Sequence, residues 1–147
     1  MGIAAFVIQE IPYIIMPFIK SASNPIMNMQ NEMKWIETIE GILGMLSMIL
    51  LMLIVRDDVK LFPITTTKDK AFFALTVFMI LINFVGWTFY YWGYQYGWLI
   101  VIGQFAVVLL YYLCFGLWKR NYLLVGTAAL FFIIHTINGF MNFIMKK

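Results

Sequence analysis

The chain has 147 residues, of which 63% are hydrophobic and 18% aromatic, whereas only 12% are charged. A soluble domain has about twice that share of charged residues. The mean hydropathy is +0.89, and the net charge of +3 comes without any run of lysine and arginine that would bind nucleic acid. The composition therefore excludes an ordinary soluble protein and a nucleic-acid-binding protein, and it indicates a protein of the lipid bilayer.

Five apolar stretches fill most of the chain, and short polar segments separate them. They predict helices at residues 3–19, 35–55, 71–92, 98–118 and 122–145. A transmembrane helix needs about 20 apolar residues to cross roughly 30 Å of hydrocarbon, and the stretches reach or approach that length. We therefore predict an all-α integral membrane protein, with residues 1–147 forming one domain, a compact bundle of five transmembrane helices. Such a protein would be a multi-pass protein of the cell or plasma membrane.

The first stretch is the least regular of the five. Gln9, Glu10, Pro12 and Pro17 interrupt its apolar sequence, and Pro12 should kink the helix because proline removes a backbone hydrogen bond. If this segment lies in the membrane interface, four transmembrane helices remain and keep their orientation. A cleaved signal peptide is not expected, because no basic residue precedes the apolar region.

The second stretch has two distinctive faces. Glu37 and Glu40 lie three residues apart on one side, which is typical of a solvated helix start favoured by the helix dipole. Gly41, Gly44 and Ser47 are small residues that suit close contact with another helix. This small-residue face would lie against another chain if the protein is an assembly subunit.

Basic residues between the stretches predict the orientation in the membrane. Those on the side of the N-terminus are Arg56, Lys60, Lys68, Lys70, Lys119 and Arg120, and those on the opposite side are Lys20, Lys34, Lys146 and Lys147. The excess favours the side of the N-terminus as cytoplasmic. The segments at residues 20–34 and 91–97 should then face outward.

Polar side chains recur near the middle of the predicted helices or toward their outer ends. They are Glu10, Asn83, Gln104, His135 and Asn138. An ionised group at mid-depth costs at least a few kcal/mol, so Glu10 must be neutral, paired or beside water, and it is a functional candidate. The alternative is that these side chains only join helices, through hydrogen bonds worth about 0.6 kcal/mol each.

Aromatic residues crowd the hairpin between the third and fourth helices. They are Trp87, Phe89, Tyr90, Tyr91, Trp92, Tyr94, Tyr96 and Trp98. An interfacial belt of tryptophan and tyrosine explains several of them. Trp87 and Tyr90 instead share the face of Asn83 and should point inward, where aromatic faces attract cations.

These patterns predict a polar, aromatic-lined cavity that is open to the outer side. Its expected ligand-binding residues are Glu10, Asn83, Trp87, Tyr90, Gln104, His135 and Asn138. An amphipathic or cationic small molecule suits such walls, and the protein would bind or transport it. We expect no metal site, because the chain has one histidine and one cysteine, and no cofactor, because no phosphate-binding glycine loop or dinucleotide motif is present.

Two alternatives remain open. The chain could be a non-catalytic membrane subunit or assembly partner, either as a homo-oligomer or with a different membrane protein. It could also be an intramembrane enzyme that acts on a lipid, with Glu10 and His135 as acid and base within hydrogen-bond reach. No carboxylate lies near His135 in the sequence, so no catalytic residue is assigned and an enzyme is the less favoured of the readings.

Overall fold

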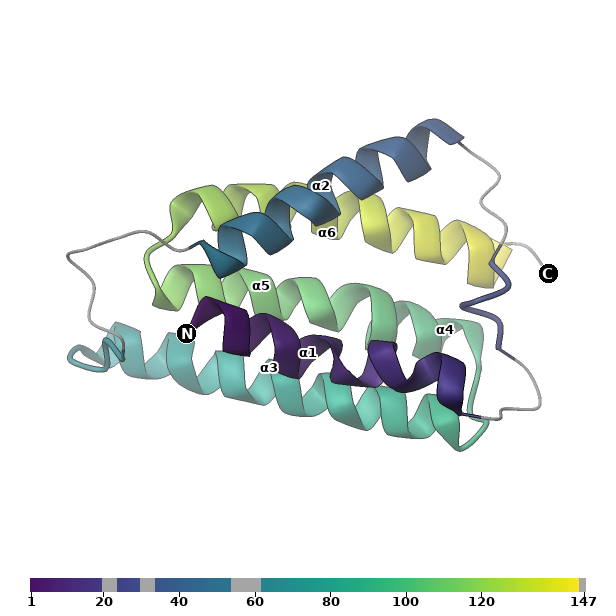
Figure 1. Ribbon diagram of the computed structural model, residues 1–147, viewed down its shortest axis with the longest axis horizontal. Helices are drawn as coiled ribbons and strands as arrows, with labels where there is room; N and C mark the ends of the chain where they lie inside the picture. Colours follow the sequence, from purple (N-terminus) through teal and green to yellow (C-terminus); the bar gives the residue numbers. More distant parts are fainter. Residues whose placement is uncertain (20–23, 30–33, 54–61, 146–147) are drawn as a thin grey trace.

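The computed structural model describes residues 1–19, 24–29, 34–53 and 62–145, and this part of the chain is helical apart from its turns and contains no strand. Successive helical segments run in opposite directions along one long axis (Figure 1). Four of them are long and apolar enough to cross a membrane. The all-helical part of the fold prediction is therefore confirmed.

The helices begin and end close to the predicted positions. Their bounds are α1 Gly2–Ile15, α2 Lys34–Met52, α3 Thr67–Tyr91, α4 Gly97–Ile100, α5 Val107–Trp118 and α6 Tyr122–Phe140. A π-helical turn at Val101–Ala106 joins α4 and α5 into one segment of 22 residues. A second π-helical turn, Met141–Met145, extends α6. Positions 54 and 55 of the predicted second helix lie outside the described residues, as do Lys20, Arg56, Lys60, Lys146 and Lys147.

The first helix is shorter than predicted. It contains Pro12 and ends at Ile15, after which Met16–Phe18 form a 3-10 turn with Pro17 near its start. The shortening follows from Pro17, because proline has no backbone N–H to donate the next helical hydrogen bond, whereas Met16 before it still has α-helical dihedral angles. With its 3-10 turn, this is the one apolar segment of the described chain that is too short to count among the four candidate spans.

The third helix begins four residues earlier than predicted because a capping box fixes its start. The Thr66 hydroxyl accepts a hydrogen bond from the Asp69 backbone N–H at 3.1 Å, and the Asp69 carboxylate accepts one from the Thr66 backbone N–H at 2.9 Å. This pairing satisfies backbone donors that a helix start leaves free. The Thr-x-x-Asp pattern was visible in the sequence.

The turn between α5 and α6 is built from local backbone and side-chain bonds. Arg120 adopts a positive φ of 55°, and the next backbone N–H, of Asn121, bonds back to the Gly116 carbonyl at 2.8 Å. This pattern closes the end of a helix. The Asn121 side chain then caps α6 by accepting a hydrogen bond from Leu124 N–H at 3.1 Å.

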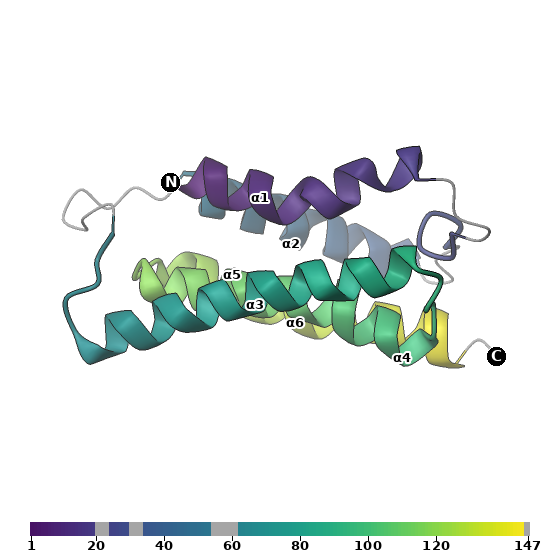
Figure 2. The ribbon, with the colours of Figure 1, turned by 90° about the horizontal axis from the view of Figure 1, so that it is seen from below.

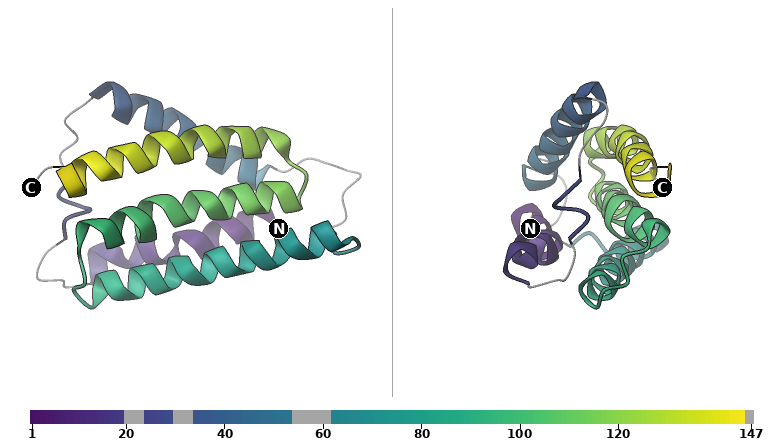
Figure 3. Two further views of the ribbon diagram at one scale, coloured as in Figure 1. Left: turned by 180° about the vertical axis from the view of Figure 1, so that it is seen from behind. Right: turned by 90° about the vertical axis from the view of Figure 1, so that its right-hand side faces the viewer.

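The helical segments form two layers (Figure 2). α1 and α2 make up one layer, and α3, the α4–α5 segment and α6 make up the other. Seen end-on in Figure 3, the segments follow one another around the bundle in the order α1, α2, α6, α5 and α3, and each packs against the next. The α4–α5 segment is the most buried of the four long ones.

The helices α1 and α2 converge at one end and separate toward the other (Figure 1). At the convergent end, a Cβ on Gly2 would lie only 2.0 Å from the carbonyl oxygen of Leu51, so a larger residue does not fit there. α1 is also tied to the other layer through its backbone carbonyls: the Tyr111 hydroxyl donates to Ala5 at 3.0 Å, and the Tyr91 hydroxyl donates to Pro12.

Most of the small-residue face of α2 packs against other residues of the same chain. A Cβ on Gly44 would lie 3.1 Å from the Phe131 side chain of α6, and Ser47 is completely buried. A Cβ on Gly41 would instead meet nothing within 4 Å. Gly44 and Ser47 are thus covered by other residues of the same chain, and among these three residues only Gly41 leaves open space beside α2.

Candidate functional site

A cavity of about 340 Å³ lies between the helices. Residues from all five helical segments and from the turn at residues 24–29 line it. The polar and titratable residues in the wall are Gln9, Glu10, Tyr13, Glu40, Asn83, Gln104, Tyr112 and His135. Aromatic and aliphatic side chains complete it, which gives the mainly apolar lining with a few convergent polar groups that is typical of small-molecule sites.

The structure brings most of the predicted site residues together. Glu10, Asn83, Trp87, Gln104 and His135 all line this cavity, although they come from four different helical segments. Their common feature in the sequence was a polar or aromatic residue on the inward face of an apolar helix. Helical spacing therefore located much of the cavity wall.

Gln104 is the most unusual polar residue in the wall. It lies in the π-helical turn Val101–Ala106, and such turns occur frequently at functional sites. The side chain is 7% exposed, and neither its oxygen nor its nitrogen has a hydrogen-bond partner among the described residues. A buried amide without a partner costs about 1–3 kcal/mol, so this side chain is suited to bind a polar group in the cavity.

Asn83 on α3 is a second buried side-chain amide with a polar atom that is unpaired within the described part of the chain. The side chain is completely buried, and its Nδ2 donates a long hydrogen bond of 3.5 Å to the Gln9 carbonyl. Its Oδ1 has no donor among the described residues. Asn83 and Gln104 therefore present two side-chain amide oxygens that need a donor.

His135 has a carboxylate partner that the sequence did not reveal. Its Nδ1 contacts Glu40 Oε1, and Asn138 Nδ2 donates to the other oxygen of the same carboxylate. The His135 imidazole also stacks on Phe105, with 4.4 Å between the two centroids. No carboxylate near His135 in the sequence pointed to this contact, because Glu40 is 95 residues away in the chain and reaches the imidazole only through the packing of α2 on α6.

Two predicted ligand-binding residues do not line the cavity. Asn138 is not a lining residue, but its side chain donates a hydrogen bond to the Glu40 carboxylate in the wall. The buried Tyr90 hydroxyl donates to Asn24 Oδ1 at 2.7 Å and accepts from the Ile26 backbone N–H at 3.3 Å. Tyr90 thus fixes the turn that supplies Ile26 and Met29 to the wall.

The aromatic hairpin divides into an inner and an outer group. Trp87 is buried in the cavity wall and makes an edge contact with Tyr13, at a centroid distance of 6.1 Å. Trp92 and Tyr96 are 71% and 70% exposed. The inward direction predicted for Trp87 is therefore observed, and the outer group has the exposure expected of an interfacial belt.

The predicted site residues did not include four polar or titratable residues of the wall, which are Gln9, Tyr13, Glu40 and Tyr112. Gln9 accepts a hydrogen bond from the Tyr112 hydroxyl at 2.9 Å, and both side chains are buried. Glu40 was interpreted as part of a solvated helix start. Gln9 and Glu40 could have been suspected from their polarity, whereas Tyr112 lies between apolar residues and gave no signal.

The charges of the wall are unbalanced. Among the described residues that line the cavity there are two carboxyl side chains, Glu10 and Glu40, and no lysine or arginine. His135 is the one basic side chain in this set, and it is engaged with Glu40. The described residues contain no cluster of three or more metal-binding side chains. The arrangement favours a cation with donor groups over an anion.

Comparison of the chain with protein-family models, with curated proteins and with solved structures gave no match in any of the three cases.

Proposed function

We propose that the chain is an integral membrane protein whose five helices form a compact transmembrane bundle. The length and apolar composition of four helices support this proposal. The outward faces of the helices also carry many exposed apolar side chains, such as Leu123 at 74% exposure. A soluble monomer rarely exposes apolar patches of more than a few hundred Å², whereas lipid would cover such surfaces.

We further propose that the bundle binds or transports an amphipathic, cationic small molecule in its central cavity. The observation that carries this proposal is a wall with two carboxyl groups and no lysine or arginine among its described residues. Aromatic faces in the same wall attract cations, and the attraction grows when water is excluded. A volume of about 340 Å³ falls at the lower end of the range for small-molecule sites, which suits a compact head group.

Binding of benzylammonium to the purified protein in lipid nanodiscs tests the proposal. We expect saturable binding to the wild type and binding at least tenfold weaker to Glu10→Gln, a loss of about 1.4 kcal/mol. Affinity of the wild type should fall as the pH is lowered from 9 to 5, because protonation removes the negative charge of Glu10. This pH dependence should disappear in Glu10→Gln.

A conservative variant supplies the control for this experiment. Glu10→Asp keeps the charge and should keep most of the affinity, whereas general damage to the fold would weaken both variants alike. Wild-type binding that is equal from pH 5 to pH 9 would contradict a role for Glu10. Chemical conversion of a lipid by the protein, with no cation binding, would favour the intramembrane enzyme instead.

A further inference from the structure

A second hollow lies between α2 and α6 and adjoins the cavity. Its volume is about 560 Å³. Glu37, Gly41, Gly44 and Met45 line it from α2. We call it the α2–α6 groove. Three further residues, Glu40, Met48 and Phe131, line both the groove and the central cavity.

The groove is suited to hold a hydrocarbon chain. Met45 and Met48 are flexible apolar side chains, which adapt to ligands of varied shape, and Phe131 adds an aromatic surface. Space remains beside Gly41, since a Cβ there would meet no atom within 4 Å. At Gly44 the Phe131 side chain already fills the corresponding position. The open part of the groove therefore lies at Gly41, one residue from the carboxylate of Glu40.

The acceptors in the cavity specify the head group. Asn83 Oδ1 and Gln104 Oε1 are buried acceptors without a donor among the described residues, and Glu10 and Glu40 add carboxylate oxygens to the same wall. A primary ammonium group has three N–H donors and a positive charge, so it matches both features. A quaternary ammonium group has no N–H donor and would leave the amide oxygens unpaired.

We infer that the ligand is a single-chain primary amine whose ammonium group lies in the cavity and whose alkyl chain lies in the α2–α6 groove. This inference rests on the proposed function and adds to it the class of ligand and the path of its chain. The rival occupant of the groove is a second copy of the protein. Continuity with the cavity favours the ligand, as does the burial of Gly44 and Ser47 against the chain's own residues.

Substitution of Gly41 tests the inference. Wild type, Gly41→Leu and Gly126→Leu are compared in phosphatidylcholine nanodiscs, with dodecylammonium as the long-chain probe and benzylammonium as the compact one. Gly126 is the matched control because a Cβ there also meets nothing within 4 Å, and the residue lines neither hollow. Empty nanodiscs correct for the dodecylammonium that partitions into lipid.

The inference predicts a selective loss. Gly41→Leu should weaken dodecylammonium binding about tenfold, because a leucine side chain overpacks the space of the alkyl chain. Benzylammonium binding should stay unchanged, and Gly126→Leu should affect neither probe. Met45→Trp narrows the same groove from another position and should show the same selectivity, which guards against a folding defect specific to Gly41→Leu.

The results of this experiment distinguish the proposed function from the placement of the alkyl chain in the groove. If neither amine binds the wild type, the proposed function is wrong. If both bind and neither groove variant distinguishes them, the function stands and the placement of the chain in the groove is overturned. If Gly41→Leu changes the size of the complex in nanodiscs and leaves dodecylammonium binding intact, the groove is a contact between copies, which also overturns the inference.

Discussion

At the scale of single residues, the Gln104 amide lowers the free energy of unfolding and provides a group that can bind a ligand. Its amide is buried and has no partner among the described residues, so replacement by the similarly shaped methionine breaks no hydrogen bond that the structure shows. Gln104→Met should therefore raise the free energy of unfolding by about 1 kcal/mol and weaken benzylammonium binding. Denaturation in detergent and the nanodisc binding assay measure the two effects. A less stable Gln104→Met variant would contradict this account of the side chain.

The residues of the site show where sequence reasoning succeeds and where it stops. Helical spacing identified Asn83, Gln104 and His135 as inward-facing, because that property depends on the residue's own helix alone. The contact between His135 and Glu40 depends on how α2 and α6 pack, and no local pattern contains this information. The position of Tyr90 depends in the same way on a turn 66 residues away in the sequence.

At the scale of helices, two glycines allow α3 and the α4–α5 segment to approach each other closely. A Cβ on Gly86 would lie 3.1 Å from the Cα of Gly103, which is backbone and cannot rotate away. Gly86→Ala should thus lower the free energy of unfolding by about 1–3 kcal/mol through overpacking. Gly126→Ala provides the contrast. A Cβ there meets open space, so this variant should gain about 0.5–1 kcal/mol from the better helix former.

Thermal denaturation of the two alanine variants in the same detergent gives the comparison directly. Because both replace a helical glycine by alanine, the difference between them isolates the contact between the helices. Equal stability of the two variants would show that α3 and the α4–α5 segment lie farther apart at this point than the structure indicates.

The helix ends were predictable to within a few residues, and the larger deviations have local causes. The early start of α3 follows from the capping box of Thr66 and Asp69, a signal that the hydropathy pattern does not contain. The early end of α1 follows from Pro17. The π-helical turn around Gln104 could not be predicted, because the apolar residues on both sides would fit an ordinary α-helix equally well.

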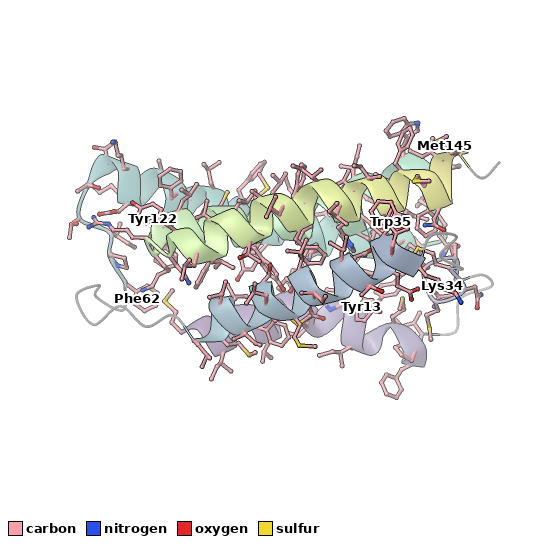
Figure 4. The ribbon with its side chains drawn as sticks, turned by 90° about the horizontal axis from the view of Figure 1, so that it is seen from above. Tyr13, Lys34, Trp35, Phe62, Tyr122 and Met145 are labelled. Carbon is pink, nitrogen blue, oxygen red and sulfur yellow. The ribbon has the colours of Figure 1, made fainter. Side chains whose placement is uncertain are left out.

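At the scale of the whole molecule, the described basic residues cluster at one end of the bundle. Lys68, Lys70, Lys119 and Arg120 lie at the start of α3 and in the turn before α6, which is also the end that holds the N-terminus. Among the described residues, Lys34 is the one basic residue at the opposite end, which Figure 4 shows together with Met145. The described residues thus show the same excess of lysine and arginine at this end as the full sequence does. The excess favours the end with the N-terminus as cytoplasmic.

Two single-cysteine variants, made in a Cys114→Ser background, test this orientation. Phe62 and Tyr96 are 57% and 70% exposed, and they lie beyond opposite ends of α3. A membrane-impermeant thiol reagent should label Tyr96→Cys in intact cells, and it should label Phe62→Cys only after the membrane is permeabilised. The reverse pattern would place the turn at residues 24–29, which lies at the same end as Tyr96, on the cytoplasmic side. A ligand that enters the cavity past this turn would then come from the cytoplasm.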